Sequence, residues 1–100
     1  MKIVLVCSAG MSTSLLVNKM EEAATEKDLD CEIYAVAMNK TAKELEQADV
    51  LLFGPQVKYL KGKFEDKAKE LNTPIDVIDP MMYGRVDGEA VLEKALSMIE

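Results

Sequence analysis

The sequence predicts a doubly wound α/β fold: a single domain with a four-stranded parallel sheet and helices on both of its faces. Three observations lead to this prediction. Short apolar runs alternate with longer helical patterns, and no repeats or linkers interrupt them. Strands separated by helices form βαβ units, which pack as parallel sheets with right-handed crossovers. The composition, with 49% hydrophobic residues and only 3 prolines among 100 residues, is that of one folded domain over residues 1–100.

Four segments have the character of strands. Lys2 to Cys7 is apolar, β-branched and short, as expected of a buried parallel strand. In the segment Cys31 to Met38, small or apolar side chains alternate with Glu32 and Tyr34 on the opposite side, which is typical of a strand at the edge of a sheet. Val50 to Phe53 is entirely apolar and is expected to be central. Ile75 to Ile78 follows a turn at Asn72 to Pro74 and supplies the fourth strand.

Helices are expected between and after these strands. The first covers Ser12 to about Asp28, and a short one follows the capping residues Asn39 to Thr41 and ends at Gln47. The third spans about Val57 to Leu71. Asp79 to Gly84 is predicted to be a loop, and Asp87-Gly88 precedes a last helix with an apolar stripe.

The charge pattern argues against nucleic-acid binding. The formal net charge is −6, and the 12 basic residues are scattered along the chain. The densest basic group, from Lys58 to Lys69, is interleaved with Glu65 and Asp66. Such alternation is typical of a solvated helix face with opposite charges one turn apart, rather than of a basic patch.

The sequence shows no sign of a membrane segment. The longest apolar runs, Ile3 to Cys7 and Val50 to Phe53, are far shorter than the ~18 residues that a spanning helix needs. Strand character begins directly after Met1, which leaves no room for a signal peptide. We therefore expect a soluble, cytoplasmic protein.

Few residues are available for catalysis. The chain contains no histidine, so it has neither a phosphohistidine nor a histidine base of its own. Its 2 cysteines, Cys7 and Cys31, are too few for a zinc site and lack the C-x-x-C spacing of a redox pair. No metal or cofactor is expected, and any cysteine chemistry must use a single thiol.

The segment after the first strand is the strongest candidate for a site. Cys7 ends the strand, and a loop of small residues, many with hydroxyl groups, opens the first helix. In this position, backbone N–H groups and the helix dipole stabilise a thiolate, and the same geometry binds phosphate. The sequence therefore predicts that Cys7 carries a phosphoryl group. The residues expected to bind the phosphate are Ser8, Ala9, Gly10, Met11, Ser12, Thr13 and Ser14.

Each candidate also has an ordinary structural interpretation. Cys7 alone would be a small buried hydrophobe, but a strand-to-helix turn needs one glycine and one cap, not six small residues. Any of the hydroxyl groups of residues 12–14 can cap the helix. Cys31 is interpreted as a core or edge-strand thiol. Gln56 and Tyr83 are expected to border the site, provided that the first strand lies beside the third.

Missing residues exclude several other sites. The turn holds only Gly10 of the three glycines of a dinucleotide fingerprint, and the Gly-x4-Gly-Lys-Ser/Thr motif is absent. Phe53-Gly54 stands where a response-regulator receiver needs an aspartate. Low-molecular-weight tyrosine phosphatases have a similar cysteine loop after the first strand, but Thr13 stands where their arginine should be. Without that arginine to stabilise the transition state, a phosphocysteine is stored rather than hydrolysed.

Two other functions stay open on these residues. One is a low-molecular-weight phosphatase-like hydrolase that uses Cys7, and turnover of p-nitrophenyl phosphate would reveal it. The other is a binding or regulatory domain in which Cys7 is inert, and slow alkylation of the thiol near neutral pH would indicate it.

The long motif from Cys7 to Val17 resembles the active-site segment of enzyme IIB of the lactose/cellobiose group of the bacterial phosphoenolpyruvate-dependent sugar phosphotransferase system. Three further segments match in order, and the similarity covers essentially the whole chain. They are Ala48-Asp49-Val50 leading to Gly54-Pro55-Gln56, then Val77-Ile78-Asp79, then Tyr83-Gly84-Arg85-Val86-Asp87-Gly88. The cysteine loop looks most like that of the cellobiose and diacetylchitobiose branch.

This resemblance implies a mechanism and two partners. Cys7, as a thiolate, would attack the phosphohistidine of a separate enzyme IIA and become a phosphocysteine. The phosphoryl group would then pass to a sugar, of the cellobiose or diacetylchitobiose type, bound by the membrane-embedded enzyme IIC. The simplest expectation is a monomer that meets these two partners in turn.

Overall fold

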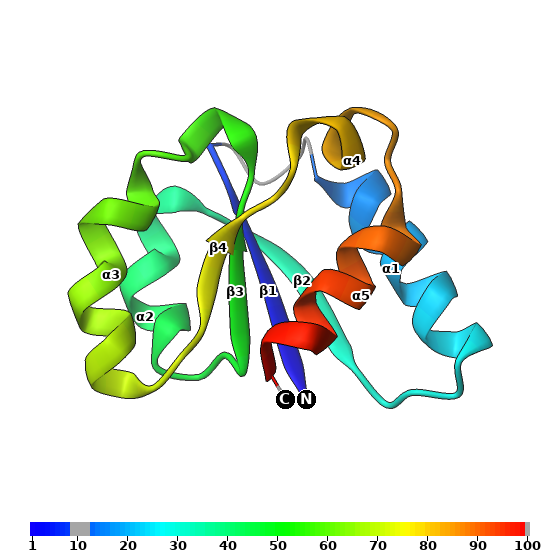
Figure 1. Ribbon diagram of the computed structural model, residues 1–100, viewed down its shortest axis with the longest axis horizontal. Helices are drawn as coiled ribbons and strands as arrows, with labels where there is room; N and C mark the ends of the chain where they lie inside the picture. The colour runs from blue at the N-terminus through cyan, green and yellow to red at the C-terminus, as the bar shows by residue number, and fades with distance from the viewer. Residues whose placement is uncertain (9–12, 100) are drawn as a thin grey trace.

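A parallel sheet of four strands forms the centre of the computed structural model, which describes residues 1–8 and 13–99. The strands are β1 (Lys2–Cys7), β2 (Glu32–Ala37), β3 (Val50–Phe53) and β4 (Ile75–Val77). Their order across the sheet is β2-β1-β3-β4, and all three pairings are parallel (Figure 1). The predictions of an edge position for the second strand and a central one for the third are confirmed.

The strand order reverses at β1. The chain moves from β1 to β2 on one side, then crosses back to β3 on the other, so β1 has a neighbour on each side. In register, Cys7 lies opposite Ala37 of β2, and Val6 lies opposite Phe53 of β3. In open α/β sheets, ligands bind at the carboxyl ends of the strands beside such a reversal. Cys7 is the residue at that position.

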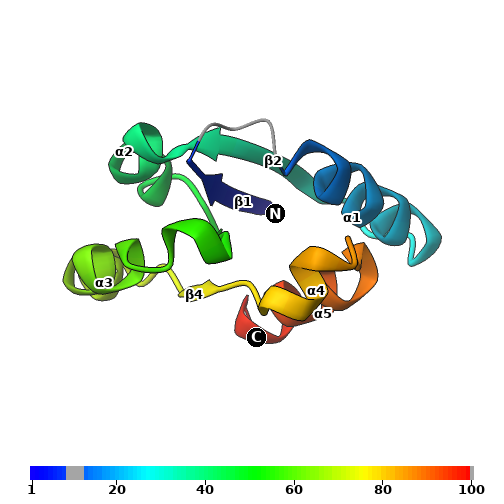
Figure 2. The ribbon, with the colours of Figure 1, turned by 90° about the horizontal axis from the view of Figure 1, so that it is seen from above.

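Helices cover both faces of the sheet, as predicted. α1 (Ser14–Glu26) and α5 (Gly88–Ile99) lie over one face, and α2 (Thr41–Leu45) and α3 (Leu60–Leu71) lie over the other (Figures 1 and 2). Because successive side chains of a strand point to opposite faces, β1 contributes to two cores. Ile3 and Leu5 pack with α1 and α5, whereas Val4 and Val6 pack with α2 and α3.

One prediction for the chain after β4 is wrong. The segment expected to be a loop from Asp79 to Gly84 contains a short helix, α4 (Pro80–Gly84). Asp79 caps this helix, since its Oδ1 accepts hydrogen bonds from the N–H groups of Met81 at 2.8 Å and Met82 at 3.3 Å. Pro80 stands at the first helical position, where its missing N–H costs nothing. The turn-forming residues therefore start a helix.

Two short 3₁₀ helices also modify the expected boundaries. η1 (Met38–Lys40) follows β2, and η2 (Pro55–Val57) separates β3 from α3. Both lie at the carboxyl end of the sheet. Within the described residues, no helix is long and apolar enough to cross a membrane.

Tyr34 on the edge strand makes a pH-dependent contribution to stability. Its hydroxyl donates a hydrogen bond to Oε1 of Glu44 at 2.5 Å, and burial together with this bond raises the pKa of Tyr34 to about 12. An unfolded tyrosine titrates near a pKa of ~10, so the stabilisation is complete below about pH 10 and lost as the pH rises toward 12. Tyr34→Phe should therefore cost about 1 kcal/mol at neutral pH. Urea unfolding of both proteins as the pH is raised tests this: the difference must shrink in alkaline solution, and parallel curves would contradict it.

Candidate functional site

Cys7 lies at the carboxyl end of β1 and is completely buried, with 0% exposure. It follows Ile3 and Leu5 at alternate positions, so its side chain points to the face covered by α1. Its Sγ atom lies 3.9 Å from the backbone oxygen of Val36 on the neighbouring strand. Such a long contact is a weak bond for a thiol donor.

Thr13 joins the start of the first helix to the sulfur. Its side chain is also 0% exposed, and its Oγ1 donates a hydrogen bond to Sγ of Cys7 at 3.4 Å. Thr13 is the N-cap residue of α1, and its backbone oxygen accepts from the N–H of Val17 at 2.9 Å. Its hydroxyl makes no capping bond to the described part of the first turn. The sequence left open which hydroxyl of residues 12–14 caps the helix and which contacts phosphate. In the structure, the hydroxyl of Thr13 bonds to the sulfur of Cys7.

Removal of this hydroxyl should slow the chemistry of Cys7. The Thr13 hydroxyl donates its hydrogen bond to the nucleophilic sulfur and holds it in a fixed position. Thr13→Val keeps the buried shape and should slow alkylation of Cys7 near neutral pH about fivefold, as loss of a bond worth roughly 1 kcal/mol implies. Thr13→Ser should restore most of the rate. Equal rates in all three proteins would show that the contact does not influence the sulfur.

The remaining residues of the predicted phosphate loop are only partly described. Ser8 is exposed directly after β1, and Ser14 is exposed at the first position of α1. Ala9, Gly10, Met11 and Ser12, which were also predicted to bind phosphate, lie outside the described residues. The first turn of α1 contains no acidic residue. Since helix N-termini attract anions, this end of α1 suits a phosphoryl group on Cys7.

The two residues predicted to border the site come together beside β1. A Cβ atom built on Gly54, directly after β3, would lie 2.7 Å from Oε1 of Gln56 and 3.7 Å from Cε1 of Tyr83. It would also lie 3.4 Å from the backbone oxygen of Val6, the residue before Cys7. Gln56 and Tyr83 thus flank Gly54 at the carboxyl end of the sheet. Tyr83 comes from α4 rather than from the predicted loop.

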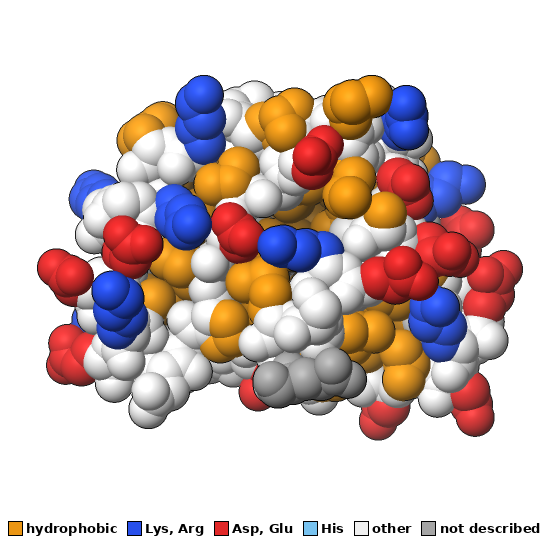
Figure 3. All heavy atoms as spheres, in the orientation of Figure 1, with side chains coloured by type: hydrophobic (Ala, Val, Ile, Leu, Met, Phe, Trp, Pro, Cys, Tyr) orange, Lys and Arg blue, Asp and Glu red, His pale blue; other side chains and the backbone are white. Residues whose placement is uncertain are grey.

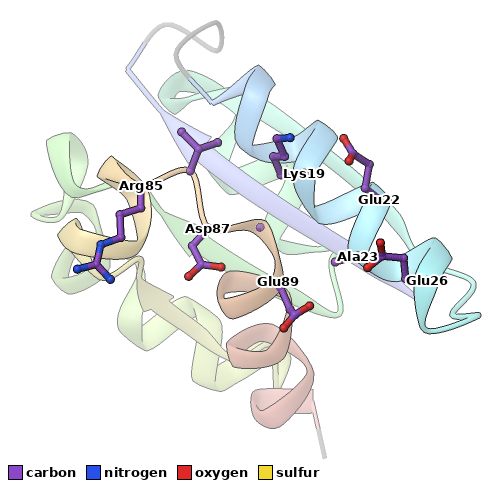
Figure 4. Close-up of a pocket in the computed structure, with 9 residues that line it drawn as sticks. Lys19, Glu22, Ala23, Glu26, Arg85, Asp87 and Glu89 are labelled. Atoms are coloured by element: carbon purple, nitrogen blue, oxygen red, sulfur yellow. The ribbon is translucent and has the colours of Figure 1, made fainter.

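Cys31 and one open surface hollow are separate from the predicted site residues. Cys31 is half-buried just before β2, at the opposite end of the sheet, with its Sγ 3.8 Å from Sδ of Met1. An open hollow of ≈ 370 Å³ lies between α1 and the α4–α5 connection (Figure 4). Its charged lining residues are Lys19, Glu22, Glu26, Arg85, Asp87 and Glu89. The residues that line this hollow do not include Cys7, Gln56 or Tyr83.

The fold and the site together define a class of protein. A nucleophilic thiol at the topological switch point, next to a helix N-terminus, suits a protein that forms a covalent adduct on sulfur and holds an anion there. Comparison with known families identifies which one. The chain belongs to the lactose/cellobiose-specific IIB family of the phosphotransferase system, because the family model for "PTS system, Lactose/Cellobiose specific IIB subunit" matches residues 2–94.

Individual relatives agree with this assignment. The chain is 45% identical over 98 residues to the oligo-beta-mannoside-specific EIIB component of Bacillus subtilis, covering 98% of this chain and 95% of the relative. It is 43% identical over 102 residues to the galactose-specific EIIB component of Lactococcus lactis, covering 97% of this chain and 94% of the relative. The solution structure of a cellobiose-specific IIB component from Borrelia burgdorferi superposes with a TM-score of 0.82 at 37% identity, covering 99% of this chain and 91% of that one.

These comparisons confirm the resemblance inferred from the cysteine motif. The chain is a phosphotransferase component that carries phosphoryl groups in sugar transport, and its α/β fold is that of solved IIB proteins. IIB components work with IIA proteins and membrane IIC proteins. These relatives are named for different sugars, so family membership does not identify the sugar.

Proposed function

We propose that Cys7 accepts a phosphoryl group from the phosphohistidine of an enzyme IIA and passes it to a sugar bound by a membrane enzyme IIC. Residues 1–100 act as one IIB domain in this relay, which runs in the cytoplasm. The observation that carries the assignment to Cys7 is its buried contact with Thr13, 3.4 Å from sulfur to hydroxyl, at the start of α1. A thiol held at a helix N-terminus can exchange a proton for a phosphoryl group.

The first transfer needs no group beyond the thiolate and the donor. The Cys7 thiolate attacks the phosphorus atom in line with the nitrogen–phosphorus bond of the phosphohistidine. A sulfur–phosphorus bond forms, the nitrogen–phosphorus bond breaks, and its electron pair returns to the imidazole. Residues 8–14 are the proposed phosphate loop, in which backbone N–H groups and the Thr13 hydroxyl receive the phosphoryl oxygens.

The second transfer reverses the role of the sulfur. A sugar hydroxyl attacks the phosphocysteine, an oxygen–phosphorus bond forms, and the sulfur leaves as a thiolate while the hydroxyl proton passes to a base of the acceptor. We propose a disaccharide of the cellobiose or diacetylchitobiose type as the acceptor sugar. The cysteine motif supports this type, as does the similarity to the cellobiose-specific IIB component of Borrelia burgdorferi.

Thr13 also favours the function of a phosphoryl carrier over that of a hydrolase. It occupies the sequence position that holds the catalytic arginine of a low-molecular-weight phosphatase, and its hydroxyl reaches the sulfur from that position. A threonine hydroxyl offers one donor, whereas an arginine offers a charged, two-pronged clamp on the transition state. A single missing stabilising group costs roughly 10²–10³ in rate. The phosphocysteine should therefore persist until a sugar acceptor arrives.

Reconstitution of the relay tests the proposal. The purified chain is mixed with phosphoenolpyruvate, enzyme I, the histidine phosphocarrier and a lactose/cellobiose-family IIA, and its intact mass and modified peptide are determined. One phosphoryl group on Cys7, absent when IIA is omitted, is the expected result. Hydrolysis of p-nitrophenyl phosphate by the chain, with no adduct from phosphorylated IIA, would favour the phosphatase-like alternative.

A further inference from the structure

Exposed apolar side chains gather around the end of the sheet that carries Cys7. Among the described residues, six large hydrophobic side chains are exposed, and four of them belong to this end. These four are Leu15 at 55%, Met38 at 42%, Tyr59 at 62% and Met81 at 61% exposure. They come from the start of α1, from η1, from the segment before α3 and from α4, which surround the end of β1 when seen from above (Figure 2).

One contact joins two of these side chains. The hydroxyl of Tyr59 lies 3.6 Å from Sδ of Met38, so two of the four touch although they are far apart in sequence. Met82, the neighbour of Met81, packs against the core and fixes α4 in place. Single exposed hydrophobic residues are ordinary, but a cluster around a reactive group indicates an interaction surface.

The charges at this end differ from those of the whole chain. The segments 38–40, 54–59 and 79–85 contain the exposed basic residues Lys40, Lys58 and Arg85. These segments contain one carboxylate, Asp79, whose Oδ1 accepts two hydrogen bonds from the backbone of α4, while Asp87 and Glu89 line the hollow beside Arg85. The chain as a whole has a net charge of −6. A basic rim on an acidic protein favours an acidic partner.

The pictures agree with this distribution. In Figure 3, hydrophobic side chains lie along the upper edge of the molecule, with basic side chains on either side of them. Figure 4 shows that the side chain of Arg85 points away from α1.

We propose that Leu15, Met38, Tyr59 and Met81, with Lys40, Lys58 and Arg85 at their edge, form the docking ring for the phosphoryl donor. The donor would be a IIA protein that presents its phosphohistidine from an apolar surface edged by carboxylates. This inference rests on the proposed function. Because Cys7 lies at the carboxyl end of β1, a phosphohistidine that delivers its phosphoryl group to the sulfur must approach this end of the sheet.

The composition of the ring favours a protein over a membrane surface as its occupant. Binding to anionic lipid headgroups by charge typically uses clusters of about 4–8 basic residues. The docking ring combines fewer charges with exposed tyrosine and methionine. Tyrosine is enriched at energetically important positions of protein interfaces, and methionine adapts its shape to a partner.

Two double variants and two controls test the docking ring. Tyr59→Ser with Met81→Ser removes apolar contacts, and Lys58→Glu with Arg85→Glu reverses the rim charge. The matched controls are Leu29→Ser, an exposed apolar position at the other end of the molecule, and Lys67→Glu, an exposed lysine two turns along α3. The initial rate of Cys7 phosphorylation is measured against the concentration of a phosphorylated IIA that modifies the wild-type chain.

The expected result is a fall of about tenfold in the second-order rate constant for each double variant, with an unchanged rate at saturating donor. The deficit of the charge variant should shrink as salt is added, since salt screens exposed charges. Both controls should react like wild type. Alkylation of Cys7 should proceed at the wild-type rate in all variants, which shows that the site itself is intact.

Other outcomes would overturn the inference. Wild-type rate constants in both double variants would show that the donor docks elsewhere. Sedimentation of the chain with phosphatidylglycerol vesicles, lost in the charge variant without any change in phosphorylation, would assign the rim to a membrane. If the wild-type chain accepts no phosphoryl group from any IIA, the proposed function itself is refuted. That outcome differs from phosphorylation at the wild-type rate in both double variants, which refutes only the docking ring.

Discussion

Cys7→Ser should abolish phosphorylation of the chain by the IIA donor, with a loss of at least about 10³-fold in rate. The hydroxyl of serine is a much weaker nucleophile than a thiolate, and the site offers no histidine to activate it. The replacement removes little volume from a position with 0% exposure, and the Val36 oxygen and Thr13 hydroxyl provide hydrogen-bond partners. The variant should therefore fold. Mass spectrometry of the intact chain after the relay reaction measures the effect.

Cys31→Ser provides the matched control for this prediction. It makes the same chemical change at the only other thiol of the chain, which lies half-buried at the opposite end of the sheet. Phosphorylation should continue at the wild-type rate. A phosphoryl group on the Cys7→Ser chain, or its loss from the Cys31→Ser chain, would contradict the assignment of the nucleophile. Urea unfolding of both variants separates loss of chemistry from loss of structure.

The sheet could be predicted from sequence because its strands are buried on both sides. Val50–Phe53 has the same bounds in the structure as in the sequence pattern, since all four side chains are apolar and buried. The edge position of Glu32–Ala37 was indicated by polar side chains on one side. Once the first strand was placed beside the third, the location of Cys7 at the switch point followed.

Features that depend on contacts between distant segments could not be predicted in the same way. Thr13 was one of several possible caps, and its bond to Cys7 depends on where α1 begins relative to β1. The helix over Pro80–Gly84 is a different case, because Asp79 as N-cap and Pro80 at the first helical position are a helix-start signal in the sequence itself.

The side chains of the proposed docking ring could not be grouped from the sequence either. Leu15 and Tyr59 stand close to the starts of helices, where sequence periodicity cannot distinguish an exposed apolar residue from a core one. Their exposure depends on how far each helix extends beyond the sheet. A search for apolar residues directly after each strand end would have found Met38.

Gly88→Ala should strongly destabilise the fold. Gly88 is the first residue of α5 and is buried against α1. A Cβ atom there would lie 2.4 Å from the backbone carbon of Lys19 and 2.5 Å from both Lys19 Cβ and Met20 N. Two of these three atoms are backbone, so no rotation of a side chain relieves the overlap. α1 or α5 must shift, although Met20 and Leu92 are fully buried in the shared core.

The expected loss in the free energy of unfolding is about 3 kcal/mol, at the upper end of the usual cost of overpacking. Gly62→Ala is the matched control, because it makes the same change within α3, where a Cβ atom meets nothing within 4 Å. Alanine is the better helix former, so this control should gain about 0.5–1 kcal/mol. Opposite signs in urea unfolding would show that contact between α1 and α5, rather than helix propensity, decides the effect at Gly88. Because α1 also positions Thr13 next to Cys7, Cys7 in a folded Gly88→Ala chain should be alkylated at a changed rate. Wild-type stability together with wild-type reactivity would mean that the two helices are less closely packed than described.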